Sequence, residues 1–215
     1  DRWREEARKA AEEADVVVMP LGEHCFQSGE AASRAFIEIP EIQQDLFRAV
    51  SEVNPNVVAV IFSGRPLDLR VISERSRAVL SVWMPGMEGG RAIIDVLTGT
   101  RTPSGKLPMS FPYCVGQVPV HYDSLMTGRP YRKGKPERYV SRYQDIPADP
   151  LYSFGYGLTY TSMELSEVHL SKDELMPGEE IEASVTIKNT GKREGTETVQ
   201  LYLRDVTGST ATVSY

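Results

Sequence analysis

Patterns of buried strands and amphipathic helices alternate over roughly the first half of the chain. Short runs of continuous apolar, β-branched residues are typical of strands buried on both faces. Apolar positions that recur every three to four residues are typical of helices that bury one face. The patterns predict strands at 15–20, 57–62 and 78–84, and helices at 1–14, 40–53, 65–74 and 86–97. This alternation predicts an α/β fold with a mostly parallel sheet.

The pattern changes twice further along the chain. Between 102 and 160, proline, glycine and tyrosine become frequent. We interpret this stretch as an ordered connector, because flexible linkers are rich in Gly and Ser and poor in aromatic residues. From 163 onward, apolar residues alternate at 181–188 and 198–204, with turn signals at 177–178 and 189–191. These segments predict an antiparallel β-sandwich, and 161–215 is short against the roughly 100 residues of a whole one.

Charge and composition exclude some classes of function. The chain has 215 residues, a formal net charge of −6 and a pI near 5.2. An acidic balance argues against nucleic acid as a partner. The most basic stretch, 129–142, is interrupted by Pro, Tyr and Glu and is interpreted as a solvated loop. No apolar run approaches the roughly 20 residues of a transmembrane helix, so we expect no membrane insertion.

Metal and cofactor signals are lacking as well. Cys25 and Cys114 have no CxxC spacing, and His24, His121 and His169 are scattered along the chain. Zinc sites require closely spaced Cys and His ligands, so we expect no metal and no cofactor. Whether the two cysteines pair with each other stays open at this stage.

The segment after the first predicted strand is the most informative. In open α/β sheets, ligands bind outside the carboxyl ends of strands. Here a connection of about 19 residues carries Glu23 and Glu30, whereas a βα loop commonly has two to six residues. Gly22 allows a sharp turn before Glu23. Either one carboxyl is a general acid/base with a raised pKa, or both are solvated and Glu30 pairs with Arg34.

Two other loops are explained by structure. Pro66 at the start of a predicted helix accounts for the 64–66 segment without an anion site. The glycines at 86, 89 and 90 fit a strand-to-helix turn, because the GxxxxGK[ST] frame of a phosphate loop is missing. There is no GxSxG nucleophile elbow, and neither cysteine stands in a nucleophile motif.

The order of these segments resembles the C-terminal half of glycoside hydrolase family 3, which contains β-glucosidases and β-xylosidases. The most specific matches are GEAASR at 29–34, SGRPL at 63–67, WMPGMEGG at 83–90, PSGKLP at 103–108 and FGYGLTY at 154–160. Further matches lie at 22–23, 39–43, 95–99, 110–112, 127–131, 189–191 and 200–202. The branch that it resembles is the periplasmic bacterial β-glucosidase type.

The resemblance implies a particular domain organisation. The family combines an N-terminal barrel, an α/β sandwich domain and often a fibronectin type III-like domain. We therefore expect a three-layer α/β sandwich at 1–115, an ordered connector at 116–160 and a partial fibronectin type III-like β-sandwich at 161–215. Because the chain begins within a helix and stops in a strand-like stretch, we expect it to be cut at both ends.

The resemblance also implies a function. Family members are retaining glycosidases, with a barrel aspartate as nucleophile and a glutamate of the sandwich domain as acid/base. By position that glutamate is Glu23, with Glu30 as second choice. We expect a fragment of a periplasmic or secreted β-glucosidase that acts on β-linked gluco-oligosaccharides or aryl glucosides. Arg65, Trp83 and Gly86 are expected to pack between domains, and substrate-binding residues are left unassigned.

The function implied by the resemblance has one consequence and two alternatives. The isolated chain is expected to be inactive, because its nucleophile would lie in the barrel of the same polypeptide. The alternatives are a non-catalytic carbohydrate-binding or structural module, or a fragment of a β-xylosidase. Glu23 discriminates the enzyme from the non-catalytic module, because an acid/base must be open to a docked barrel and not held in an ion pair with Arg34.

Overall fold

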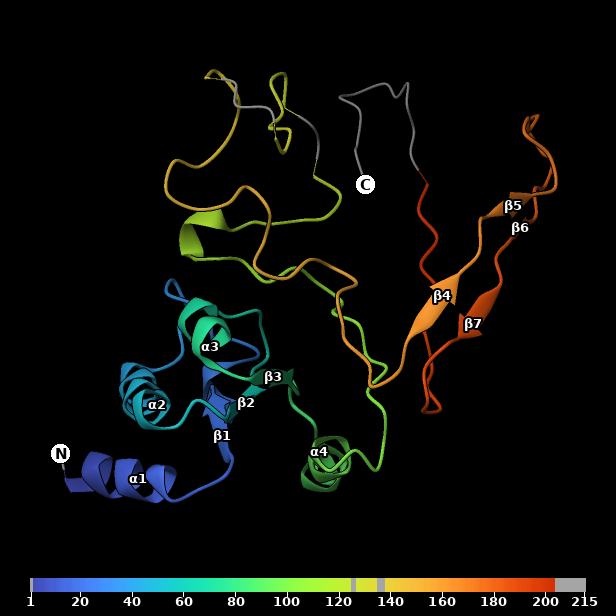
Figure 1. The fold of residues 1–215 in the computed structure, drawn as a ribbon. Helices are drawn as coiled ribbons and strands as arrows, with labels where there is room; N and C mark the ends of the chain where they lie inside the picture. The colour runs from blue at the N-terminus through green and yellow to red at the C-terminus, as the bar shows by residue number, and fades with distance from the viewer. Residues whose placement is uncertain (1, 125–126, 135–137, 204–215) are drawn as a thin grey trace. The chain divides into compact units, whose positions relative to one another are not determined.

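A computed structural model describes residues 2–124, 127–134 and 138–203 (Figure 1). The chain divides into two compact units. One comprises 1–90, 107–156 and 201–215, and the other comprises 91–106 and 157–200. Each unit is described by itself below. The domain boundaries expected at 115/116 and 160/161 differ from this division and stay a prediction.

The first unit is built on a three-stranded parallel sheet with the order β1-β2-β3. Its strands are β1 (Val17–Gly22), β2 (Val57–Phe62) and β3 (Ala78–Ser81). The predicted bounds of β2 are confirmed. β1 extends to Gly22, two residues beyond the prediction, because Leu21 and Gly22 continue the pairing with Ile61 and Phe62. The parallel α/β fold expected from the sequence is thereby confirmed.

Helices alternate with these strands along the chain as predicted. They are α1 (Arg2–Glu12), α2 (Glu41–Val53), α3 (Arg70–Arg75) and α4 (Gly89–Leu97), with short 3₁₀ turns η1 (Cys25–Gln27) and η2 (Val115–Gln117). α1 packs against α2, and α2 contacts β1. α3 begins five residues later than predicted. The residues before it form a loop, in which Asp68 makes a parallel bridge with Glu38.

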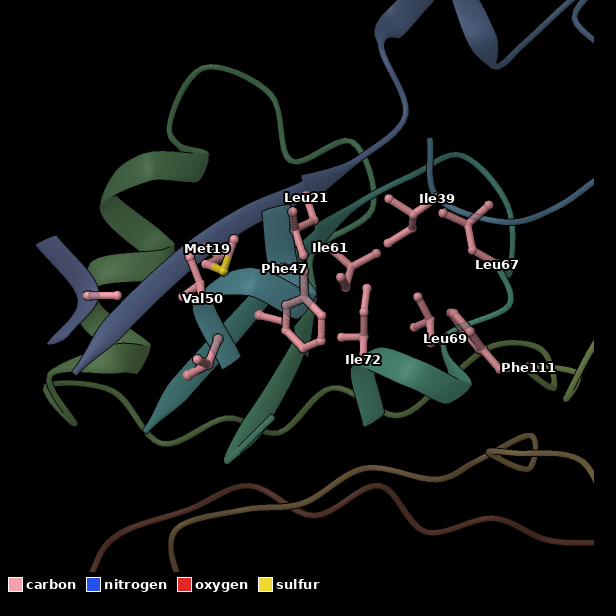
Figure 2. Close-up of a cluster of buried hydrophobic side chains, with 13 residues drawn as sticks. Met19, Leu21, Ile39, Phe47, Val50, Ile61, Leu67, Leu69, Ile72 and Phe111 are labelled. Atoms are coloured by element: carbon pink, nitrogen blue, oxygen red, sulfur yellow. The ribbon is translucent and has the colours of Figure 1, made fainter. Parts of the chain in front are cut away.

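The core of this unit lies between the sheet and α2 and α3. Figure 2 shows Met19 and Leu21 of β1 and Ile61 of β2 converging with Phe47 of α2 and Ile72 of α3. Phe47 has no exposed surface. Burying a side chain of this size contributes about 1.5–3 kcal/mol. The core fixes one face of the sheet, and the three-layer arrangement stays a prediction.

Residues 107–156 also belong to the first unit and contain little regular secondary structure. Phe111 pairs with Tyr152 in an antiparallel bridge, and its ring lies 5.7 Å from that of Trp83. Gln117 is buried, and its amide nitrogen donates to the carbonyls of 147, 148 and 149 over 3.2–3.4 Å. Isolated backbone bridges and the Gln117 side chain therefore satisfy backbone groups in this stretch.

The second unit contains two short antiparallel pairs. β4 (Met163–Leu165) pairs with β7 (Ile187–Asn189), and β5 (His169–Leu170) pairs with β6 (Ala183–Ser184). The strand predicted at 181–188 is thus divided into β6 and β7. The strand predicted at 198–204 is wrong for 198–203, which are not assigned to a strand, and residue 204 lies outside the described residues. The fibronectin type III-like identity stays a prediction.

Candidate active site

The candidate site is the loop between β1 and α2, which follows the carboxyl end of β1 as the sequence predicted. Gly22 has φ 136°, and a Cβ on it would collide with the backbone carbonyl of Phe62. Only glycine fits such an approach without strain. Glu23 then donates its backbone N–H to the Phe62 carbonyl over 2.8 Å. The loop therefore leaves the sheet while still hydrogen-bonded to β2.

A side chain of α2 also holds the backbone of Gly22. The Oε1 atom of Gln43 accepts from the N–H of Gly22 at 2.8 Å, and its Nε2 donates to the Gly22 carbonyl at 3.0 Å. An amide side chain that satisfies both backbone groups of one residue replaces a missing strand neighbour. The start of the loop is therefore held by both the sheet and a helix.

Glu23 is the buried centre of an ion-pair network. Its side chain has 0% exposure. Arg34 Nη1 lies 2.8 Å from its Oε1, and Ser63 Oγ donates to its Oε2 over 2.8 Å. Arg65 Nε lies 3.1 Å from Oε1 and 3.2 Å from Oε2. Both carboxylate oxygens are thus satisfied by charged or hydroxyl donors, as a buried anion requires.

The network sets the protonation state of Glu23. Burial raises the pKa of its carboxyl, but the hydrogen bonds from Arg34 and Ser63 and the charge of Arg65 lower it more, so the net pKa is lowered. A carboxyl of this kind stays ionised at neutral pH. A general acid needs the opposite, a proton that it retains near the working pH.

The two arginines also reach the loop backbone. Arg65 Nη2 donates to the carbonyl of Gln27 over 2.6 Å and to that of Ala32 over 2.7 Å. Arg34 Nη2 donates to the carbonyl of Glu38 over 3.0 Å. Because the arginines are themselves bound to Glu23, they tie the backbone of the loop to a buried charge.

Glu30 lies between the two carbonyls that Arg65 holds, and it is exposed. Among the described residues, its side chain makes no hydrogen bond or ion pair. The alternative in which Arg34 pairs with Glu30 is wrong, because Arg34 is bound to Glu23 and to the Glu38 carbonyl. Ala31, directly after Glu30, has φ 58°, which turns the chain at this point. The loop thus presents one carboxylate to solvent and buries the other.

The neighbouring segments support the loop. A Cβ on Gly64 would collide with the hydroxyl of Ser28, so residues 63–65 pack directly against the loop. Trp83 has φ 52°, and its carbonyl accepts from the N–H of Ser63 over 3.3 Å. The role of Ser63 was not predicted from the sequence, and the strand-end position of the SGRP segment was the only signal for it.

Several large apolar side chains on the loop and after β3 are exposed. Phe26 and Phe36 of the loop, and Met87 after β3, are largely exposed.

Cys25 is exposed and Cys114 is partly buried, and both are free thiols. Within the described ranges, no group of three or more His, Cys, Asp or Glu residues gathers to hold a metal. In the same part of the chain, no helix has the length and apolarity needed to cross a membrane.

Together, the fold and the loop define an α/β domain that presents an acidic loop at the carboxyl edge of a parallel sheet. Residues 1–160 match the glycosyl hydrolase family 3 C-terminal domain. The chain belongs to this family, as the segment order in the sequence predicted.

Relatives of known activity extend the comparison. A periplasmic β-glucosidase from Salmonella typhimurium is 49% identical over 95% of this chain, and a β-xylosidase from Formosa agariphila is 36% identical over 93%. The chain spans 27% of the length of each. The structure of a β-glucosidase from Listeria innocua in complex with gluconolactone matches 99% of this chain and 30% of its own, with 46% identity and a TM-score of 0.93. A mutant of that enzyme was solved with laminaribiose.

Proposed function

We propose that this chain is the acid/base-bearing portion of a retaining β-glucosidase and that Glu30 is the acid/base. The observation that carries the proposal is the contrast within one loop. Glu30 is an exposed carboxyl with no partner among the described residues, on a segment that Arg65 holds at both ends. A catalytic carboxyl must reach the substrate and be held by its surroundings.

Glu23, the first choice from the sequence, fits this role less well. Its side chain is buried, and its donors lower its pKa. To act as an acid it would have to give up two arginines and a serine, and then reach a sugar outside the domain. The order of preference between the two glutamates is therefore reversed in this proposal.

The chemistry follows the retaining mechanism. An aspartate from the N-terminal barrel of the full-length protein attacks the anomeric carbon while Glu30 protonates the leaving oxygen. Glu30 then removes a proton from water as that water attacks the glycosyl-enzyme. The two carboxyls must come to within about 5–5.5 Å of each other. Because the nucleophile is not among these residues, we expect the isolated 215-residue chain to be inactive on aryl glucosides.

The substrate and location are inferred from the relatives. Two of the three proteins compared are β-glucosidases, and one of these was solved with a β-linked glucose disaccharide. We therefore propose β-linked gluco-oligosaccharides or aryl glucosides as substrates. A periplasmic or secreted location is proposed because the Salmonella relative is a periplasmic β-glucosidase.

A β-xylosidase is the second candidate, because the Formosa relative has that activity. Comparing kcat/KM of the full-length protein for matched aryl β-glucoside and aryl β-xyloside substrates decides between the two. A preference for the xyloside would overturn the glucosidase proposal and leave the role of Glu30 untouched.

The test of the acid/base uses the full-length protein with Glu30→Gln and, as the matched variant, Glu23→Gln. General acid catalysis contributes about 10²–10⁴-fold, so Glu30→Gln should lower cellobiose hydrolysis by that factor. An aryl glucoside with a good leaving group needs no protonation to depart, so its glycosylation step should survive. Azide, which attacks without losing a proton, should restore turnover of that substrate.

Two other results would contradict the assignment. If Glu23→Gln gives the leaving-group dependence and azide rescue, while Glu30→Gln keeps near wild-type rates, Glu23 is the acid/base. If neither variant changes the ratio of the two substrates, the loop has no acid/base role. The domain would then act as a non-catalytic carbohydrate-binding or structural module.

A further inference from the structure

We propose that Arg65 is a positioning residue for Glu30, which it holds in place through the loop backbone. This inference rests on the proposed function of Glu30. Arg65 lies after β2, whereas the loop follows β1, so the contact joins two neighbouring strand ends. Arg65 makes no contact with Glu30 itself.

The geometry of the guanidinium carries the argument. Its Nη2 donates to the carbonyls of Gln27 and Ala32, which lie three residues before and two residues after Glu30. Holding both ends of a short turn fixes where the residue between them points. A planar guanidinium can make these contacts and bind a carboxylate at once, which a lysine ammonium on a flexible stem cannot.

Glu23 and Ser63 hold Arg65 itself. Nε lies 3.1 Å from one carboxylate oxygen of Glu23, and the backbone N–H of Arg65 donates to Ser63 Oγ over 3.1 Å. The Arg65 carbonyl lies 2.7 Å from Ser63 Oγ and shares its single hydroxyl hydrogen with Glu23. The side chain is therefore anchored at its stem and at its head. In this arrangement the buried Glu23 serves catalysis indirectly, because it orients the arginine that orients the loop.

A substitution can separate the positive charge of Arg65 from its hydrogen bonds to the two loop carbonyls. Arg65→Lys keeps a cation near Glu23, but its single nitrogen cannot replace both Nε at Glu23 and Nη2 at the two carbonyls. A displacement of about 1 Å at a catalytic group can lower a rate on the order of 100-fold. In the full-length protein, we expect Arg65→Lys to lower kcat on cellobiose about 10- to 100-fold, with a much smaller loss on the activated aryl glucoside.

Two further measurements distinguish positioning from a loss of fold. Hydrogen exchange of the amides at 28–33 should become faster in Arg65→Lys, while exchange in β1 and β2 stays at wild-type rates. Adding Arg65→Lys to Glu30→Gln should lower cellobiose hydrolysis no further, because residues that act as a unit are not additive. Arg8→Ala serves as the control, since Arg8 pairs with Glu52 and the Ala49 carbonyl, away from this loop.

The results that overturn the inference differ from those that overturn the proposed function. If Arg65→Lys leaves exchange at 28–33 unchanged, or slows both substrates equally, Arg65 does not position Glu30. If loop exchange rises but Glu30→Gln shows no leaving-group dependence, the assignment of Glu30 fails and the catalytic role of Arg65 fails with it.

Discussion

Two glutamates seven residues apart occupy opposite environments in one loop. Glu23 is buried against two arginines and a serine, and Glu30 is exposed without a protein partner among the described residues. The difference arises from the strand end. Glu23 still pairs with β2 through its backbone, whereas Glu30 lies at the turn beyond η1. The same residue type is thus a buried, compensated anion in one place and, in the proposed mechanism, the proton carrier in the other.

An acidic residue near a strand end can have one of two roles, stabilising the fold or taking part in chemistry. A carboxylate with several cationic donors stabilises the folded state and keeps a low pKa. A carboxylate that is available for chemistry has oxygens without protein hydrogen bonds until the substrate binds. Substitutions of the two residues should therefore affect different properties, stability for Glu23 and turnover for Glu30.

The largest expected effect on stability is that of Glu23→Ala. Removing one partner of a buried pair leaves an uncompensated charge and destabilises by about 3–5 kcal/mol. Here two guanidinium groups lose their shared partner. Hydrogen exchange of the β1 and β2 amides in the full-length protein measures this loss. Exchange rates within a factor of two of wild type would contradict the anchoring role of Glu23.

An intermediate effect is expected from pH. Because the folded-state pKa of Glu23 is lowered from its ordinary value of 4.5, its stabilisation is present above that value and is lost as pH falls through the lowered pKa. Glu23→Gln carries no titrating group, so the stability difference between wild type and variant should shrink below pH 4.5. Thermal unfolding midpoints of both proteins between pH 7 and pH 3 measure this. A difference that is constant with pH would contradict the lowered pKa.

The smallest expected effect is that of Glu30→Gln on stability. An exposed side chain without partners contributes within about 0.5 kcal/mol, so the unfolding midpoint should stay at its wild-type value. The thermal unfolding midpoint is measured as for Glu23→Gln, which makes the two Gln substitutions a matched pair. A large loss of stability would mean that Glu30 is part of the folded network and would remove the basis for the comparison.

Much of the fold could be predicted from the sequence. The run of residues from Val57 to Phe62 is continuously apolar and β-branched, and it forms β2 with the predicted bounds. The start of α3 could not be predicted in the same way. Residues 65–69 have a helix-compatible pattern, but Arg65 and Asp68 are engaged by the loop and by Glu38. Tertiary contacts override local propensity there.

The candidate site lies on the connection that the sequence singled out, but its contacts could not be predicted in detail. The long connection after a buried strand pointed to Glu23 and Glu30, yet nothing local distinguishes them. Their difference depends on Ser63 and Arg65, which lie 40 and 42 residues from Glu23 along the chain. Pairing of β1 with β2 brings them together, and a sequence pattern does not reveal which carboxylate they meet.

The register of β1 against β2 bears on how the two strands pair correctly during folding. Gly22 lies opposite Phe62, which brings Glu23 beside Ser63. A shift of one residue would displace the strands by about 3.3 Å and turn every side chain of β1 to the other face. Glu23 would then be separated from Ser63 and Arg65, whereas Arg34 on its own loop would move with it. Losing the charged partner Arg65 from a buried carboxylate costs several kcal/mol. The buried carboxylate therefore favours the native register of the sheet, because that register brings Ser63 and Arg65 to it.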